Sequence, residues 1–275
     1  MYKRVLFALD LEGVNCVVGE PYSGLARDTK EWNIARAQAV LEVNAAADAL
    51  FAAGVDSIGL WDNHGRGNNV DLALVDPRVT PIRAESTTPR MQFADGKYDC
   101  ICFFGYHTME GTLGGVLAHT MSSKAVQYYK LNGRYVGEVD MDSYIAAAMG
   151  IPSRFFAGGN IACEQAKRAV SDILTVTTKT ELSRNAAIFR DNDELFADIR
   201  ETIVRAIMTE GEARPLSYPA TLEKSFKRVE DAEKYLVRLR DGGITADYPS
   251  DEILGKDAHT VVSKINDVGD FIKCL

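Results

Sequence analysis

Short apolar runs alternate with stretches of helical periodicity over the first two thirds of the chain. Apolar runs at residues 5–9, 56–61, 98–104 and 154–157 predict buried β-strands. Between the first two runs, apolar residues recur at about every 3.6 positions from 29 to 53, which predicts a helix that ends at Gly54. A further helix is predicted from about residue 161. This alternation predicts an α/β fold with a mostly parallel sheet covered by helices on both faces.

The last third of the chain has a different pattern. Residues 192–209 form an amphipathic repeat that predicts a helix, and residues 222–239 predict a second helix rich in charges. A proline-containing stretch, 215–219, separates the two. We therefore expect a smaller helical or α+β region toward the C-terminus. Because the sequence contains no internal repeat and no clean linker, we expect residues 1–275 to form a single compact unit, with 210–275 as an appended region.

Composition excludes several functional classes. The 275 residues include 31 Lys and Arg against 39 Asp and Glu, which gives a net charge of −8. This acidic balance argues against a protein that binds the phosphate backbone of nucleic acids. No apolar stretch approaches the ~18 residues of a transmembrane helix. Among the five cysteines, Cys100 and Cys102 alternate along one apolar run, which favours buried thiols over a metal-binding pair. These features predict a cytoplasmic protein with reduced thiols and no membrane or nucleic-acid partner.

Polar residues follow each of the three clearest predicted strands. Asp10 and Glu12 follow the first, His64 follows the second, and His107 follows the third. In an open parallel sheet the carboxyl ends of the strands share one edge, where ligands bind, so we expect these side chains to converge. Carboxylates and imidazoles are the usual ligands of zinc and similar ions. Two carboxylates as close as Asp10 and Glu12 would also repel each other without a cation between them.

Each cluster taken alone has a simpler interpretation. Asp10 and Glu12 also fit a helix or turn cap followed by a solvated carboxylate, and residues 62–65 also fit a tight turn. Histidine placement favours the metal site, because His64, His107 and His119 are three of only four histidines and lie in or just after the strand-end clusters. The fourth, His259, lies apart in the C-terminal segment and is expected to be a surface or structural residue.

Two loops deliver further candidates to the same edge. A glycine-rich loop, 111–119, ends at His119; it lacks the lysine of a P-loop, which excludes nucleoside triphosphate binding. Asn132 and Gly133 are typical of a hairpin turn, and they would place Glu138 at the far end of a returning strand. Taken alone, Glu138 fits a surface strand carboxylate equally well.

Read together, these segments resemble the D-aminopeptidase family of zinc peptidases, peptidase family M55. The resemblance rests on residues 9–13, 42–46, 62–65, 105–120 and 131–138, in the family's order and nearly its spacing, and on residues 182–187, which are similar to the family's Ser-Arg-x-Ala-Ala segment. It spans about residue 4 to 210. The loop from His107 to His119 is one residue longer than in the family, and Gly158-Gly159-Asn160 stands where the family has Gly-Asp-Asp.

The resemblance implies a two-zinc aminopeptidase that acts on short peptides with N-terminal D-amino acids. The metal ligands that it implies are Asp10, Glu12, His64, His107 and Glu138, with Asp10 as the bridge between two divalent ions, expected to be Zn²⁺. His119 resembles the catalytic histidine. The family also implies a homo-oligomer, a ring-shaped decamer that encloses the active sites.

The expected function is hydrolysis of the N-terminal amide of a short peptide by a metal-activated water. Two alternatives remain open from the sequence. One is a related metal-dependent amidase with a non-peptide, small-molecule amide as substrate. The other is a non-catalytic metal-binding oligomer of the same fold.

Overall fold

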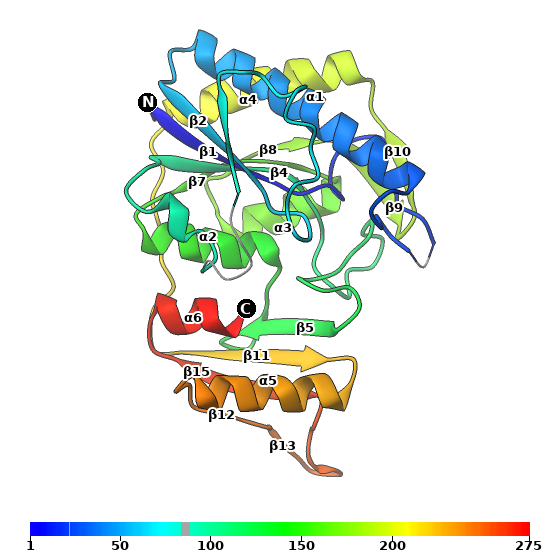
Figure 1. The fold of residues 1–275 in the computed structure, drawn as a ribbon, viewed down its shortest axis with the longest axis vertical. Helices are drawn as coiled ribbons and strands as arrows, with labels where there is room; N and C mark the ends of the chain where they lie inside the picture. Colours follow the sequence, from blue (N-terminus) through cyan, green and yellow to red (C-terminus); the bar gives the residue numbers. More distant parts are fainter. Residues whose placement is uncertain (22, 84–88) are drawn as a thin grey trace.

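A six-stranded parallel sheet forms the centre of the protein (Figure 1). The computed structural model describes residues 1–21, 23–83 and 89–275. The strands, in spatial order, are β3 (Val79–Ile82), β2 (Ser57–Asp62), β1 (Arg4–Leu9), β4 (Cys100–Tyr106), β7 (Ser153–Gly158) and β8 (Leu174–Thr177). Every neighbouring pair runs parallel. The predicted α/β class and the four predicted strands are therefore confirmed.

Helices cover both faces of this sheet, in agreement with the prediction. Helices α1 (Lys30–Ala52) and α4 (Asn192–Met208) lie on one face, and α2 (Glu138–Ala148) and α3 (Asn160–Ala169) lie on the other (Figure 1). Strand β1 shows the cause, because Phe7 packs with α1 and α4 while Leu6 packs with α2 and α3. A central strand buried on both sides must be apolar at every position.

Helix α1 begins and ends close to where the sequence predicts. The hydroxyl of Thr29 accepts a hydrogen bond from the Trp32 amide at 3.2 Å and caps the first turn. Gly54 follows the last turn with a φ of 88°, a conformation that glycine adopts without a steric penalty. The buried thiols predicted for Cys100 and Cys102 are also confirmed, since both pack in the core beneath α1 and α4.

A second, antiparallel sheet occupies the end of the molecule that contains the C-terminus (Figure 1). Its strands, in spatial order, are β12 (Ala246–Asp247), β15 (Thr260–Ile265), β11 (Ala220–Phe226), β5 (Val126–Leu131) and β6 (Arg134–Tyr135). Helices α5 (Val229–Asp241) and α6 (Val268–Cys274) pack against it. The predicted smaller α+β region is thus present, and β5 and β6 from the middle of the chain contribute two of its strands.

The remaining elements are short. Strands β9 (Lys179–Ser183) and β10 (Ala186–Phe189) form one hairpin, and β13 (Ser250–Asp251) and β14 (Gly255–Lys256) form another. A 3₁₀ turn, η1 (Gln92–Ala94), precedes β4. Within the described ranges, no helix combines the length and the apolar character needed to cross a membrane.

The helix predicted over 222–239 is wrong in its first part. Residues 220–226 form β11, which pairs with both β5 and β15, and the helix begins only at Val229. Lys224 is among the charged residues of the predicted helix, but its side chain is buried and its Nζ lies 4.9 Å and 4.5 Å from the ring centres of Tyr129 and Tyr235. Contacts with these aromatic rings favour the strand over the local helical pattern.

The predicted setting of Glu138 is also wrong. The strand after the Asn132–Gly133 turn contains only residues 134–135, and Glu138 is the first residue of α2. Helix α2 starts here because Gly137 is extended and its amide donates to Asp140 Oδ2 at 2.9 Å, which caps the first turn. Glu138 therefore projects from a helix N-terminus.

Candidate metal centre

Backbone hydrogen bonds hold the loop that follows β1 against the end of β4. The Asp10 amide donates to the Phe104 carbonyl at 2.8 Å, and the Gly13 amide donates to the Gly105 carbonyl at 2.7 Å. Glycine is needed at both contact points, because a Cβ at Gly13 would lie only 2.0 Å from the Tyr106 carbonyl oxygen, and a Cβ at Gly105 only 2.0 Å from the Asp10 carbonyl oxygen. This close approach brings Asp10 and Glu12 beside the residue that follows β4, His107.

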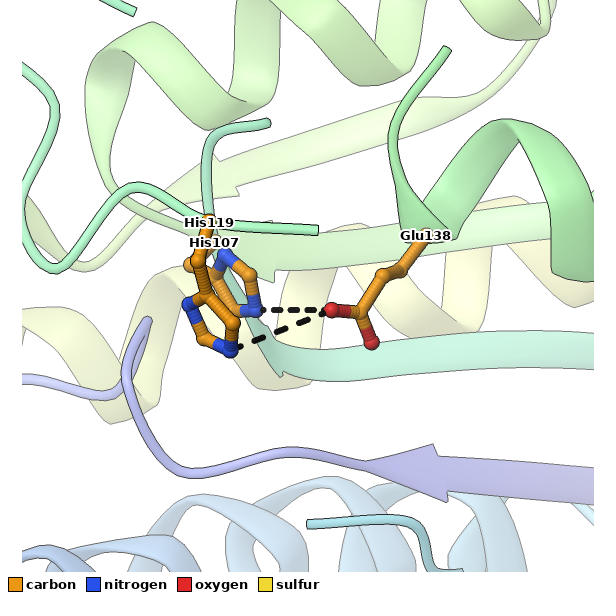
Figure 2. A group of neighbouring side chains, drawn as sticks. All are labelled: His107, His119 and Glu138. Carbon is orange, nitrogen blue, oxygen red and sulfur yellow. Dashed lines mark ion pairs between the residues drawn. The ribbon is translucent and has the colours of Figure 1, made fainter. Parts of the chain in front are cut away.

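The structure brings all six candidate residues together. His64 Nε2 lies 3.2 Å from Glu12 Oε1, and His107 Nε2 lies 3.5 Å from Asp10 Oδ2 and 3.3 Å from Glu138 Oε1. His119 Nε2 lies 4.0 Å from the same Glu138 oxygen, and Figure 2 shows both imidazoles directed at that carboxylate. Potential ligand atoms of Asp10, Glu12 and His107 lie within 4.8 Å of one another, as do those of His107, His119 and Glu138.

Hydrogen bonds to the backbone fix which nitrogen of two histidines faces the centre. His107 Nδ1 lies 2.9 Å from the Thr108 carbonyl, and His119 Nδ1 lies 2.8 Å from the Leu117 carbonyl. A carbonyl only accepts, so each Nδ1 carries the proton. In a neutral imidazole the lone pair is then on Nε2, which points at buried carboxylate oxygens. Two groups of acceptors that face each other repel unless a proton or a metal ion lies between them, and this tautomer is the usual one for an Nε2 metal ligand.

Buried nitrogen and oxygen atoms that lack a hydrogen-bond partner also indicate a metal site. Glu12 Oε2, His64 Nδ1 and His107 Nε2 are buried and form no well-oriented hydrogen bond with any described residue. Leaving buried polar atoms unpaired is costly, and native proteins avoid it unless water or an ion completes the set. Imidazoles and carboxylates are common ligands of zinc in catalytic sites. The residues present therefore fit divalent ions.

The pKa shifts of the candidate ligands also support a site for divalent ions. Burial and the neighbouring charge of Glu12 raise the pKa of Asp10 well above its usual value. Although burial opposes it, Glu12 and Asp10 raise the pKa of His64 to about 10, and Glu138 and Asp10 raise the pKa of His107 to about 10. The metal-free centre thus holds protons on these two imidazoles to balance its carboxylates. Divalent ions would displace those protons.

His119 differs from the other histidines in the centre. Burial and the nearby His107 lower the pKa of His119, so it is neutral at pH 7. Its ring stacks on that of His107 with centroids 4.0 Å apart. The side chain of His119 is 14% exposed against 2% for His107, and it lines the open cavity. A neutral, accessible imidazole at this position can exchange protons with a bound substrate.

A cavity of about 340 Å³ opens onto the centre. Five of the six candidate residues line it, and they are Asp10, Glu12, His64, His119 and Glu138. Its other walls come from residues 23–26, 63, 65, 117 and 121–124, and from Arg90 and Arg184. The candidate ligands are therefore accessible to a small molecule. His259 lies elsewhere, with Nδ1 2.9 Å from the Phe226 carbonyl.

Lys179 is a supporting residue that the sequence does not reveal. It is fully buried at the start of β9, and its Nζ donates to the carbonyls of Glu12, Val14 and Val17 at 2.5, 2.9 and 2.6 Å. These bonds hold the loop that presents Glu12. Glu42, in one of the motifs behind the family resemblance, supports the same loop by accepting from the Asn15 amide at 2.8 Å. A single lysine in a short strand carries no local signal of this role.

Arg90 and Asp142 form a second support that the sequence does not reveal. Arg90 Nε and Nη2 donate to the two oxygens of the buried Asp142 at 2.5 and 2.8 Å. The Tyr106 hydroxyl also donates to Asp142, at 2.7 Å, and accepts from Asn63 Nδ2 at 2.9 Å. This chain of bonds links the ends of β2 and β4 to α2, whose first residue is Glu138.

Comparison with known proteins gives three matches. The model of the family Peptidase M55, D-aminopeptidase, matches residues 3–241. A D-aminopeptidase of Bacillus subtilis (strain 168) is 23% identical over 219 residues, which cover 78% of each chain. The solved structure of the Zn-dependent D-aminopeptidase DppA from Bacillus subtilis, a self-compartmentalizing protease, superposes with a TM-score of 0.84 and 20% identity over 98% of this chain and 94% of that chain.

Proposed function

The chain belongs to the D-aminopeptidase family M55, which makes it a metallopeptidase, and we propose that it is a binuclear zinc aminopeptidase for short peptides with an N-terminal D-residue. The observation that carries this proposal is the orientation of His107 and His119. Each ring donates a hydrogen bond from Nδ1–H to a backbone carbonyl and directs Nε2 toward buried carboxylates. Such an arrangement is stable when cations complete it.

Five residues would hold the ions, namely Asp10, Glu12, His64, His107 and Glu138. When bound, two divalent ions supply Lewis acidity toward a carbonyl oxygen and lower the pKa of water to about 7. The protein's own contribution is to fix these ligands before substrate arrives. Glu12 is restricted by the contact between the loop after β1 and the end of β4, and by the ammonium of Lys179.

His119 is the proposed proton carrier. Its Nδ1 donates to the Leu117 carbonyl at 2.8 Å, and its amide donates to the Thr108 carbonyl at 3.2 Å, and these bonds favour the orientation in which the ring faces the cavity. Because its pKa is lowered, Nε2 has a free lone pair at neutral pH. It can accept a proton from the attacking water and return it to the leaving amine.

We also propose that the protein assembles with copies of itself in the cytoplasm. The related DppA is a self-compartmentalizing protease. In this chain, apolar side chains of the β9–β10 hairpin face solvent, with Leu182 56% and Ile188 61% exposed, and Leu113 on the glycine-rich loop is 96% exposed. Packing against another copy would remove such apolar surface from water.

The test is hydrolysis of D-alanyl-D-alanine and L-alanyl-L-alanine by zinc-loaded protein, with and without a chelator. We expect the D-peptide to be cleaved, the chelator to abolish cleavage and added zinc to restore it. Cleavage that survives the chelator would contradict a metal mechanism. Cleavage of non-peptide amides but of neither dipeptide would favour the amidase alternative.

A further inference from the structure

Three basic side chains line the cavity that opens onto the metal centre, namely Arg90, Lys124 and Arg184. Three basic side chains in one cavity are unusual for a chain whose net charge is −8. The three cations share the cavity with Asp10, Glu12 and Glu138. The cavity therefore carries negative charge at the centre and positive charge elsewhere on its wall.

The charge of Arg90 is already compensated. Its Nε and Nη2 form a two-point ion pair with Asp142, a carboxylate with no exposed side-chain surface. Such bidentate pairs are strong and leave little of the guanidinium for another anion. Arg90 therefore positions the end of α2 and is a poor candidate for binding a ligand.

Lys124 and Arg184 are different. Neither forms an ion pair with any acidic residue in the described part of the chain, and both side chains are exposed. Arg184 Nη1 donates to the Ala118 carbonyl at 2.7 Å, and the Arg184 carbonyl accepts from the Leu117 amide at 2.9 Å. The first of these bonds anchors the guanidinium one residue from His119 and leaves its other nitrogens as donors.

Position on the wall indicates which part of a substrate these cations meet. A peptide whose N-terminal amide lies at the metal centre must extend its leaving residue past His119, which gives that residue its proton. Arg184 is anchored beside His119, and Lys124 lines the same cavity together with its sequence neighbours 121–123. A volume of about 340 Å³ is at the small end for ligand cavities, which suits a dipeptide better than a long chain.

We propose that Lys124 and Arg184 bind the free C-terminal carboxylate of the leaving residue, which makes unblocked dipeptides the preferred substrate class. This inference rests on the proposed function. Guanidinium and ammonium groups recognise carboxylates through charge-assisted hydrogen bonds. The carboxylate would hold the scissile amide in register with the centre, and a longer or amidated peptide would lose that contact.

The test compares D-alanyl-D-alanine with its C-terminal amide on zinc-loaded protein. The quantity measured is the ratio of kcat/KM for the free acid to kcat/KM for the amide. The variants are Lys124→Gln and Arg184→Gln, and the matched control is Lys234→Gln, an exposed lysine on α5. Arg184→Gln also removes the bond to the Ala118 carbonyl, but a resulting loss of turnover affects both substrates and cancels in the ratio.

We expect a ratio of at least about ten in the unaltered protein and in Lys234→Gln, and a fall of about threefold or more in each cavity variant. A ratio near one in the unaltered protein, or an unchanged ratio in both cavity variants, would overturn the proposal. If neither peptide is cleaved, the proposed function fails. The ratio of dissociation constants for the two uncleaved peptides, measured by calorimetry, then decides the carboxylate site by the same criteria.

Discussion

Replacing Lys179 by methionine tests the support of the Glu12 loop. The substitution leaves three buried carbonyls, those of Glu12, Val14 and Val17, without their donor. Each unpaired acceptor costs about 1–3 kcal/mol. The substitution also removes a buried charge, since burial lowers the pKa of Lys179 from 10.5 to about 8, a shift that corresponds to about 3 kcal/mol. The cost of leaving three carbonyls unpaired exceeds the free energy gained by removing the buried charge, so we expect a net destabilisation of about 3 kcal/mol.

The assay is urea unfolding followed by circular dichroism, and the chain offers a matched control. Lys224 is also buried, its pKa is lowered by burial to about 7, and its Nζ donates to the Leu275 carbonyl at 3.0 Å. Lys224→Met loses one carbonyl bond and the contacts of the ammonium with Tyr129 and Tyr235, but it relieves a larger charge penalty, so it should destabilise the protein less than Lys179→Met. If Lys179→Met is as stable as the unaltered protein, or the two variants behave alike, the reasoning about Lys179 is refuted.

The same lysine predicts a pH dependence. Between pH 8 and 10.5 the unfolded chain keeps the Lys179 proton while the folded protein has released it, because the pKa of Lys179 is lowered to about 8 on folding. Folding stability should therefore rise with pH across this window. The rise should be smaller in Lys179→Met, which is measured by repeating the urea titration at several pH values.

Three further predictions concern the centre. His119→Gln should keep its metal and lose at least about a hundredfold in kcat, measured with metal analysis on the same sample. Zinc binding at pH 7.5 should release protons from both His64 and His107, whose pKa values are raised to about 10, and calorimetry in buffers of different ionisation enthalpy counts them. Asp142→Asn leaves the charge of Arg90 without its partner and should destabilise the protein by about 3–5 kcal/mol in urea unfolding.

The central strands were predictable because burial on both faces makes them continuously apolar. The strands at the edges of the sheet are not continuously apolar, so the sequence did not predict them. In β3 the middle residues are exposed and one is Pro81, and β8 is only partly buried along its length. Strand β11 was missed for another reason. Lys224 is charged, yet it packs against aromatic rings that lie far away in the sequence. A hydropathy pattern reports local periodicity and cannot report such partners.

The convergence of four candidate ligands, Asp10, Glu12, His64 and His107, was predictable from one rule of topology. Parallel strands end at the same edge, so polar residues after β1, β2 and β4 converge whatever their separation in sequence. The setting of Glu138 was not predictable, because a capping bond from Gly137 to Asp140 replaces the expected strand by a helix. Lys179 was not predictable either. It contacts the Glu12 carbonyl across 167 positions of sequence, and only the folded chain reveals that contact.

Metal content per chain tests the central claim most directly. The protein is purified, loaded with zinc, passed through a desalting column and analysed by emission spectrometry, with Glu12→Gln treated in parallel. We predict two zinc ions per chain in the unaltered protein and fewer in the variant. An unaltered protein that retains no zinc would contradict the binuclear centre and the mechanism built on it.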